Sequence, residues 1–252
     1  MPSYWNVVND VLHQADLIIE VLDARMIEQT RNREIEEKIS RLNKKILYVI
    51  TKCDLVSHQQ VEKAAQRLSP SVFISAKDKF GTTVLLKKIL EISHGEPVLV
   101  GVLGYPNVGK SSLINALAGR HAAKTSPHSG FTRHLQKIKV NSKIVILDTP
   151  GVFPLKEKNE IKHAQTGAVS YDKIKDPEAA VLQLISDQKK KVQWHYQVDG
   201  DDPEELLEHI AIKLGKLLKG GLPNLELAAI AVLKDWQTGK IKIPITPRGR
   251  VL

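Results

Sequence analysis

The chain has 252 residues and a formal net charge of +9, from 37 Lys and Arg against 28 Asp and Glu. This length allows one medium domain and a second, smaller one. The single cysteine, Cys53, excludes an internal disulfide and a zinc site made of cysteines. No apolar run approaches the roughly 18 residues of a membrane span, and the first residues do not resemble a signal peptide. We therefore expect a soluble, cytoplasmic protein without a membrane partner, and we take it to be a monomer.

The positive charge is unevenly distributed along the chain. Residues 1–165 carry 24 Lys and Arg against 16 Asp and Glu, whereas residues 166–252 carry 13 against 12. Between residues 97 and 147 there is no carboxylate, and the cations are Lys110, Arg120, Lys124, Arg133, Lys137, Lys139 and Lys143. Such a stretch suits a polyanionic partner such as RNA, although a solvated basic surface would have the same composition.

The first two thirds of the chain alternate between strand-like and helix-like segments. After an amphipathic segment at 5–15, short apolar runs predict strands at 17–22, 46–50, 72–74 and 98–103. Apolar residues at helical spacing predict helices between them, at 34–42, 59–68 and 83–92. Two further strands, 135–140 and 143–147, are joined at Asn141-Ser142 as a hairpin. This alternation is typical of an α/β fold, a mostly parallel sheet flanked by helices.

From about residue 166 the pattern becomes helical. Helix starts are indicated at Asp176-Pro177, Asp202-Pro203 and Pro223-Asn224. We therefore predict a domain over 1–165 and a smaller α-helical domain over 166–252. The run Lys189-Lys190-Lys191 is interpreted as a solvated helix end. The aromatic residues of this domain could stack on RNA bases. For Trp194 and Trp236, however, we favour a position in the core.

A phosphate-binding motif follows the fourth predicted strand. The motif Gly104-x4-Gly109-Lys110-Ser111 stands between the apolar run 98–103 and the helix-like segment 112–118. Its glycines let the loop approach phosphate oxygens closely, and backbone N–H groups at the helix start supply positive potential. Lys110 can reach the β- and γ-phosphates, and the Ser111 hydroxyl can ligate Mg²⁺. The sequence therefore predicts nucleotide contacts from Asn107, Val108, Gly109, Lys110, Ser111 and Ser112.

A second phosphate-side element, Asp148-Thr149-Pro150-Gly151, directly follows the strand-like run 144–147. Asp148 is expected to hold Mg²⁺ through a water molecule, and Gly151 to offer its N–H to the γ-phosphate. The loop after Gly151 would then respond to the presence of that phosphate.

The base is expected to be recognised by Thr51-Lys52-Cys53-Asp54. The Asp54 carboxylate can accept two hydrogen bonds from guanine N1–H and its 2-amino group, which adenine cannot supply. The aliphatic part of Lys52 would cover the face of the ring. Thr51 offers only a hydroxyl at a position where asparagine usually bridges two loops. A second base contact is predicted at Ser75-Ala76-Lys77, where the Ala76 N–H would reach guanine O6.

The basic loop 121–133 contains Gly130-Phe131-Thr132-Arg133. Thr132 is the better candidate, and Thr125 the weaker one, for a hydroxyl that closes on Mg²⁺ when triphosphate is bound; an ordinary loop threonine is the alternative. We expect Lys110, Thr132 and Gly151 to act in catalysis. The histidines near these loops fit no metal motif, and we assign them no role as a base: His121, His128, His134 and His163.

In chain order the base-reading motifs come first and the phosphate loop, Thr132 and Asp148 follow, which is a cyclic rearrangement of the usual GTPase order. With this order the chain resembles the circularly permuted GTPases of the YlqF/YawG group. The resemblance extends to residues 15–25, which are similar to that family's opening strand, and to residues 219–226 and 235–241, which are similar to the helical tail of archaeal and eukaryotic members. It implies a circularly permuted P-loop NTPase fold.

The resemblance also implies a GTPase that acts in assembly of the large ribosomal subunit, with GTP, GDP and rRNA as partners and no DNA. Val152 stands where many GTPases have the glutamine that orients water, so intrinsic turnover should be slow. A ribosomal partner or K⁺ would then organise the water. Asn107 occupies the position that coordinates K⁺ in cation-dependent relatives, or else is a residue that tolerates a tight turn.

Three readings of function therefore remain open. The leading one is an RNA-dependent GTPase switch for ribosome assembly. The others are a nucleotide-gated RNA-binding module with negligible hydrolysis, and a GTPase acting on another RNA system. Because the permuted order joins the γ-phosphate-sensing segment 152–163 directly to the helical domain, we also hypothesise that loop movement is passed to that domain.

Overall fold

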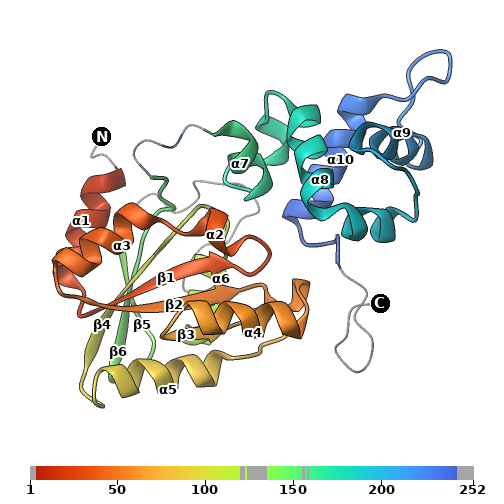
Figure 1. Cartoon of the computed structure of the whole chain (residues 1–252). Coiled ribbons are helices and arrows are strands. Elements are labelled where there is room, and N and C mark those ends of the chain that lie inside the picture. Colours follow the sequence, from red (N-terminus) through yellow and green to blue (C-terminus); the bar gives the residue numbers. More distant parts are fainter. Residues whose placement is uncertain (1–3, 120–122, 124–134, 155–156, 158, 243–252) are drawn as a thin grey trace. The chain divides into compact units, whose positions relative to one another are not determined.

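The computed structural model describes residues 4–119, 123, 135–154, 157 and 159–242. The chain divides into two compact units, Met1–Glu157 and Lys158–Leu252 (Figure 1). The first unit contains the β-sheet, and the described part of the second is built of helices joined by short connections. None of the described helices has both the length and the apolar character needed to cross a membrane.

One six-stranded sheet organises the first unit, in the order β3-β2-β1-β4-β6-β5. The strands are β1 Leu17–Asp23, β2 Lys45–Thr51, β3 Ser71–Phe73, β4 Val98–Gly104, β5 Gln136–Lys139 and β6 Ile144–Asp148. Neighbouring strands are parallel except β5 and β6, which form the predicted antiparallel hairpin. Every residue of the interior strand β1 is buried, because helices cover both faces of a parallel sheet. The predicted fold class is confirmed.

The helices of this unit are α1 Tyr4–Gln14, α2 Ile27–Thr30, α3 Arg33–Arg41, α4 His58–Arg67, α5 Thr82–Ile92 and α6 Lys110–Ala118. Helices α1 and α3 pack on the sheet through one apolar cluster, which includes Val11, Ile18, Ile35, Leu103 and Val152. Helix α5 lies on the other side of the sheet in Figure 1. Helix α4 packs on β2 through a second cluster, Leu22, Tyr48, Ile50, Ala64 and Leu68. These layers fix the positions of the strand ends.

The second unit contains α7 Glu160–Gln165, α8 Pro177–Tyr196, α9 Pro203–Lys213 and α10 Leu225–Gln237. The last three begin where the sequence predicts, because an Asp or Asn side chain accepts a hydrogen bond from a first-turn N–H in each: Asp176, Asp202 and Asn224. Trp236 is fully buried, and its Nε1 donates to the Gln165 carbonyl at 2.8 Å. The predicted core position of Trp236 is confirmed.

The boundary between the units differs from the sequence prediction. The predicted boundary follows residue 165, whereas helix α7, which begins inside the segment 152–163 and ends at Gln165, packs against α8. The boundary therefore lies earlier, between Glu157 and Lys158. A helix of six residues is too short for its apolar periodicity to be recognised in sequence.

Two expectations for α8 were wrong. The lysine run directly follows a kink at Gln188 (φ −130°, ψ 27°), where the second helical segment of α8 begins, and it is not fully solvated. Lys191 is buried, and its ammonium lies 5.9 Å from the centre of the Trp236 ring. Trp194, expected in the core, is 53% exposed. The buried side of the helix after the kink is formed instead by Lys191, Val192 and Tyr196.

Candidate nucleotide-binding site

The predicted nucleotide motifs meet at one edge of the sheet. Asp23, Thr51, Gly104 and Asp148 are the last residues of β1, β2, β4 and β6. The register pairs Asp23 with Thr51, Val21 with Gly104, and Val102 with Asp148. Because these four strands are parallel, their carboxyl ends lie together, which is where open α/β sheets bind ligands. Motifs far apart in the sequence thus form one site.

The phosphate loop has backbone conformations that glycine and asparagine adopt most readily. Gly104 has φ +148°, and a Cβ there would lie 2.6 Å from the Val21 carbonyl oxygen of the neighbouring strand. Asn107 and Gly109 have φ values of +59° and +104°. Helix α6 then begins at Lys110, so its first N–H groups face the loop. The strand, loop and helix therefore form an anion-binding geometry.

Lys110 is buried beneath this loop. Its Nζ donates to the carbonyl oxygens of Gly104 at 3.0 Å and Tyr105 at 2.6 Å. Burial lowers the pKa of Lys110 to about 8, although the charge of Asp148 acts in the opposite direction. Both acceptors are neutral carbonyl oxygens, which do not balance the charge of a buried ammonium. A phosphate group would supply an anionic partner for it.

Asp148 is equally desolvated. Burial raises the pKa of Asp148 to about 6, although the charge of Lys110 opposes this. Its Oδ1 is buried and has no hydrogen-bond partner among the residues that the structure describes. An oxygen of this kind suits a hydrated Mg²⁺, with the Ser111 hydroxyl at the start of α6 as a second ligand. The residues present therefore fit the predicted metal.

The segment after Asp148 is pressed against the phosphate loop. Thr149 Oγ1 donates to the Val102 carbonyl at 2.7 Å, and the Val152 N–H donates to the Gly104 carbonyl at 3.2 Å. A Cβ on Gly151 would lie 2.6 Å from both N and Cα of Pro106, so only glycine fits here. The Gly151 N–H is consequently held next to the phosphate loop. Val152 itself is buried in the apolar cluster of α1 and α3.

Thr51 bridges two loops in spite of its short side chain. Its Oγ1 lies within hydrogen-bond distance of the Leu22 carbonyl, at 2.9 Å, and of the Val108 carbonyl in the phosphate loop. Its single proton can be donated to one of them at a time. The hydroxyl therefore joins the base-reading strand end to the phosphate loop, which is the connection that an amide was expected to provide.

Lys52 makes a connection that the sequence did not predict. Its Nζ donates to Asp23 Oδ2 at 2.7 Å and to the Asn107 carbonyl at 2.8 Å. The residue is in the left-handed region, with φ +57°. Burial lowers the pKa of Lys52, although the charge of Asp23 opposes this. The expected contact of its aliphatic part with a base ring stays a prediction, whereas its ammonium is committed to the phosphate loop.

The two base-reading motifs are joined through Ser75. Its Oγ lies 2.9 Å from Asp54 Oδ1 and 3.1 Å from Asp78 Oδ2, and it accepts a hydrogen bond from the Asp78 N–H. Ala76 and Lys77 follow in the turn, with Ala76 half-buried and Lys77 exposed. The structure therefore brings Asp54 and Ser75 together, in agreement with a shared base site.

Several predicted residues lie outside the described residues: Thr125, Thr132, His121, His128 and His134. Upstream of that part, the Asn115 side chain of α6 makes two 2.7 Å hydrogen bonds with the backbone N–H and C=O of Ala123. Sequence reasoning gave no role to Asn115, Asp23 or Arg25. For Asp23 and Arg25, the sequence offered one signal of a role in the site, which is their Asp-x-Arg spacing directly after a predicted buried strand.

A phosphate loop, an Asp-Thr-Pro-Gly segment and an aspartate-containing base motif at one sheet edge define a P-loop GTPase domain, here with circularly permuted connectivity. A family model described as "50S ribosome-binding GTPase" matches residues 99–213. In fold and in sequence the chain is similar to the circularly permuted GTPases of the YlqF/YawG group.

Individual relatives agree with this. An uncharacterized GTP-binding protein of Methanocaldococcus jannaschii is 36% identical over 93% of this chain and 65% of its own length. A nuclear GTP-binding protein of Saccharomyces cerevisiae is 33% identical over 95% of this chain and 55% of its own length. The GDP-bound structure of YlqF from T. maritima is 25% identical, covers 97% of this chain and 96% of that chain, and has a TM-score of 0.69. The chain thus spans between half and two thirds of these two curated relatives.

Proposed function

We propose that this protein binds GTP with Mg²⁺ at the carboxyl edge of its sheet and hydrolyses it slowly to GDP and phosphate. The single observation that supports this most is the convergence of three residues on that edge: Lys110 at the start of α6, Asp148 at the end of β6, and Asp54 in the short turn of helix, Cys53–Leu55, that follows β2. The relatives are named as GTP-binding proteins, and the T. maritima structure is GDP-bound. Guanine is favoured over adenine because its N1–H and 2-amino group can donate to the Asp54 carboxylate, and adenine has no donors at these positions.

In this proposal some residues of the site bind the phosphates and others bind Mg²⁺. Lys110 leaves the loop carbonyls and pairs with the β- and γ-phosphates, while the Gly151 N–H donates to the γ-phosphate. Ser111 and, through water, Asp148 hold Mg²⁺, which when bound neutralises phosphate charge. Thr132, outside the described residues, is the proposed closing hydroxyl.

Hydrolysis is proposed to depend on an outside group. Val152 is 2% exposed and packs in the apolar core, so its side chain cannot orient water. We propose stimulation by a ribosomal partner or by K⁺ at Asn107, whose left-handed backbone supports the tight turn as well. Faster single-turnover hydrolysis in K⁺ than in Na⁺, lost in Asn107→Ala, would support the K⁺ site. Equal rates in the two salts would contradict it.

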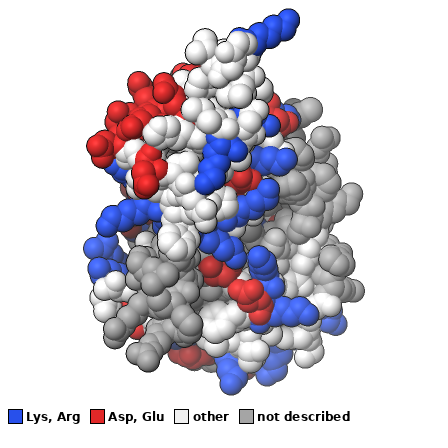
Figure 2. Space-filling model, turned by 90° about the vertical axis from the view of Figure 1, so that its right-hand side faces the viewer, with Lys and Arg blue, Asp and Glu red and all other residues white. Residues whose placement is uncertain are grey.

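We further propose that the protein acts in the cytoplasm as a monomeric switch in assembly of the large ribosomal subunit, through rRNA. Support comes from the description of the matching family as ribosome-binding. On the face in Figure 2, Lys and Arg are interspersed with Asp and Glu, so charge alone does not select an RNA site there. The exposed Trp194 of α8, one turn after the exposed Lys190, is a better base-stacking candidate.

Single-turnover GTP hydrolysis and co-sedimentation, each with and without large ribosomal subunits, test this function. We expect subunits to accelerate hydrolysis and the protein to bind them more strongly with a GTP analogue than with GDP. The buried Val152 also favours a second candidate, a nucleotide-gated RNA-binding module with negligible hydrolysis. Nucleotide-dependent binding without any acceleration would favour that second candidate, and absence of both effects would contradict a ribosomal role.

A further inference from the structure

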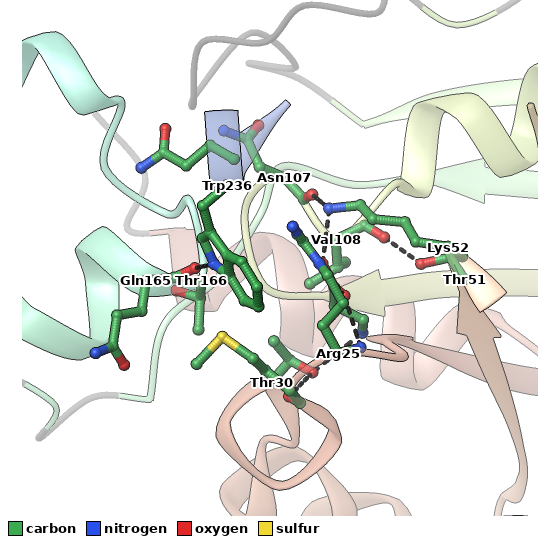
Figure 3. A network of polar contacts seen from close by, with 12 residues as sticks. Arg25, Thr30, Thr51, Lys52, Asn107, Val108, Gln165, Thr166 and Trp236 are labelled. Atoms are coloured by element: carbon green, nitrogen blue, oxygen red, sulfur yellow. Dashed lines mark hydrogen bonds and ion pairs between the residues drawn. The ribbon is translucent and has the colours of Figure 1, made fainter. Parts of the chain in front are cut away.

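Asp23, at the end of β1, belongs to none of the nucleotide motifs but is surrounded by donors from Arg25 and Lys52. Its Oδ1 accepts from the Arg25 N–H and Nε, both at 3.0 Å, and its Oδ2 accepts from Arg25 Nη2 at 2.7 Å. Oδ2 also accepts from Lys52 Nζ at 2.7 Å. Figure 3 shows Arg25 and Lys52 with the phosphate-loop residues beside them. The carboxylate thus joins two cations at the floor of the site.

Charge makes this arrangement interdependent. Burial opposes ionisation of Asp23, but the charges of Arg25 and Lys52 and their hydrogen bonds outweigh it and keep the pKa of Asp23 well below its usual range. The side chains of Asp23 and Arg25 are each only 2% exposed. Removing one member of such a buried group leaves the others uncompensated, which costs far more than loss of a surface ion pair. Lys52 therefore depends on Asp23 for its place.

The end of β1 supports two successive carbonyl groups of the phosphate loop. Lys52 connects Asp23 with the Asn107 carbonyl, and the Thr51 hydroxyl lies between the Leu22 and Val108 carbonyls and can donate to either of them. Both connectors come from the end of β2, whose register with β1 pairs Asp23 with Thr51. Two neighbouring loop positions are therefore held by two neighbouring β1 positions. Asn107, which has the left-handed φ of +59°, is one of the two loop residues contacted in this way.

We propose that Asp23, partly neutralised by Arg25, is a positioning residue for nucleotide binding that acts through Lys52 on the phosphate loop. It holds the Lys52 ammonium against the Asn107 carbonyl and thereby fixes the loop in its phosphate-binding conformation. This inference rests on the proposed guanine-nucleotide binding. Asp54 is held separately by Ser75, so base selection is independent of Asp23.

A double-mutant cycle tests the route through Lys52. GDP affinity is measured by calorimetry for the wild type, Asp23→Asn, Lys52→Met and the double variant. We expect each single variant to weaken GDP binding by at least about tenfold, as for truncation of a buried charge pair. Because Asp23 acts through Lys52, the double variant should bind GDP as Lys52→Met does. Asp23→Asn leaves the Lys52 ammonium without its carboxylate and could therefore fail to fold. The double variant has no such lysine, so comparing its GDP affinity with that of Lys52→Met still tests whether Asp23 acts through Lys52.

Two comparisons separate positioning from general stability. Asp23→Asn should weaken GDP and inosine diphosphate by the same factor, because inosine lacks only the 2-amino group that Asp54 reads. Arg31→Gln, which breaks the partly buried pair of Arg31 with Glu36 on the same flank of the sheet, serves as a matched control and should leave GDP affinity unchanged. The proposal is overturned if Asp23→Asn binds GDP like the wild type, if the losses of the two single variants add up in the double variant, or if base preference is lost. A wild type that binds no GDP would instead overturn the proposed function, and this inference with it.

Discussion

The buried carboxyl group of Glu20 makes a sharp prediction about stability and pH. Glu20 lies in the middle of β1 and is fully buried. Its Oε1 accepts from the Asn32 N–H at 2.8 Å, and its other oxygen, Oε2, is buried. A side-chain hydrogen bond with Glu36 also favours the protonated form of Glu20. Burial, helped by the neighbouring charge of Glu36, raises the pKa of Glu20 from 4.5 to about 8, against the lowering effect of the Asn32 hydrogen bond. Glu20 is therefore protonated in the folded protein at neutral pH.

The sign of the pH dependence follows from this pKa. Between pH 4.5 and about 8 the unfolded chain has released the Glu20 proton while the folded chain retains it. Raising the pH through this window therefore favours unfolding, and the loss levels off above pH 8. Since one pH unit corresponds to about 1.4 kcal/mol, the loss from Glu20 is at most ~5 kcal/mol. Glutamine retains the acceptor for Asn32 and cannot ionise.

Urea denaturation of the wild type and Glu20→Gln at several pH values from 5 to 9 measures this loss. We expect similar free energies of unfolding near pH 5, and a growing advantage of Glu20→Gln as the pH approaches 8 to 9. Titrating groups that do not interact with Glu20 are shared and cancel in the difference, so the difference reports Glu20 together with its neighbour Glu36. Curves that stay parallel across this range would refute the assignment of a protonated, buried Glu20.

Three further substitutions have expected outcomes. Gly151→Ala places a methyl group against Pro106 and should lower the free energy of unfolding by about 1–3 kcal/mol, measured by thermal denaturation; an unchanged melting temperature would contradict the close approach. Tyr105→Phe removes the hydroxyl that donates to Glu157 and should cost about 1 kcal/mol in the same assay, whereas a more stable variant would show that this contact is not formed. Trp194→Ala should weaken binding to large-subunit rRNA by about 1–3 kcal/mol without loss of stability, and unaltered rRNA affinity would exclude stacking on this exposed ring.

The sheet could be predicted from sequence because each strand carries its own signal. The apolar runs at 17–22 and 98–103 are bounded by aspartate, proline or glycine residues, and burial of both sheet faces explains why they do not alternate. The phosphate loop could be predicted because its chemistry is contained in eight consecutive residues, 104–111. Local signals were therefore sufficient for the fold and for the phosphate side of the site.

The remaining features depend on contacts between distant segments. That Lys52 pairs with Asp23 follows from the register of β1 with β2, which no local pattern contains. That Thr51 can replace an amide follows from the distance between the Leu22 and Val108 carbonyls. That Trp194 is exposed follows from which side of α8 packs in the helical unit, a side formed after Gln188 by Lys191, Val192 and Tyr196. A sequence read in short windows cannot supply these three.

Asp54 is proposed to select guanine at this sheet edge. Calorimetric titration of the wild type and Asp54→Asn with GDP and xanthosine diphosphate tests it directly, because xanthine presents a carbonyl oxygen where guanine presents the 2-amino group. The wild type should prefer GDP, and Asp54→Asn should lose GDP affinity and prefer xanthosine diphosphate, since an amide can donate where a carboxylate cannot. An Asp54→Asn variant that retained full GDP affinity would contradict the account.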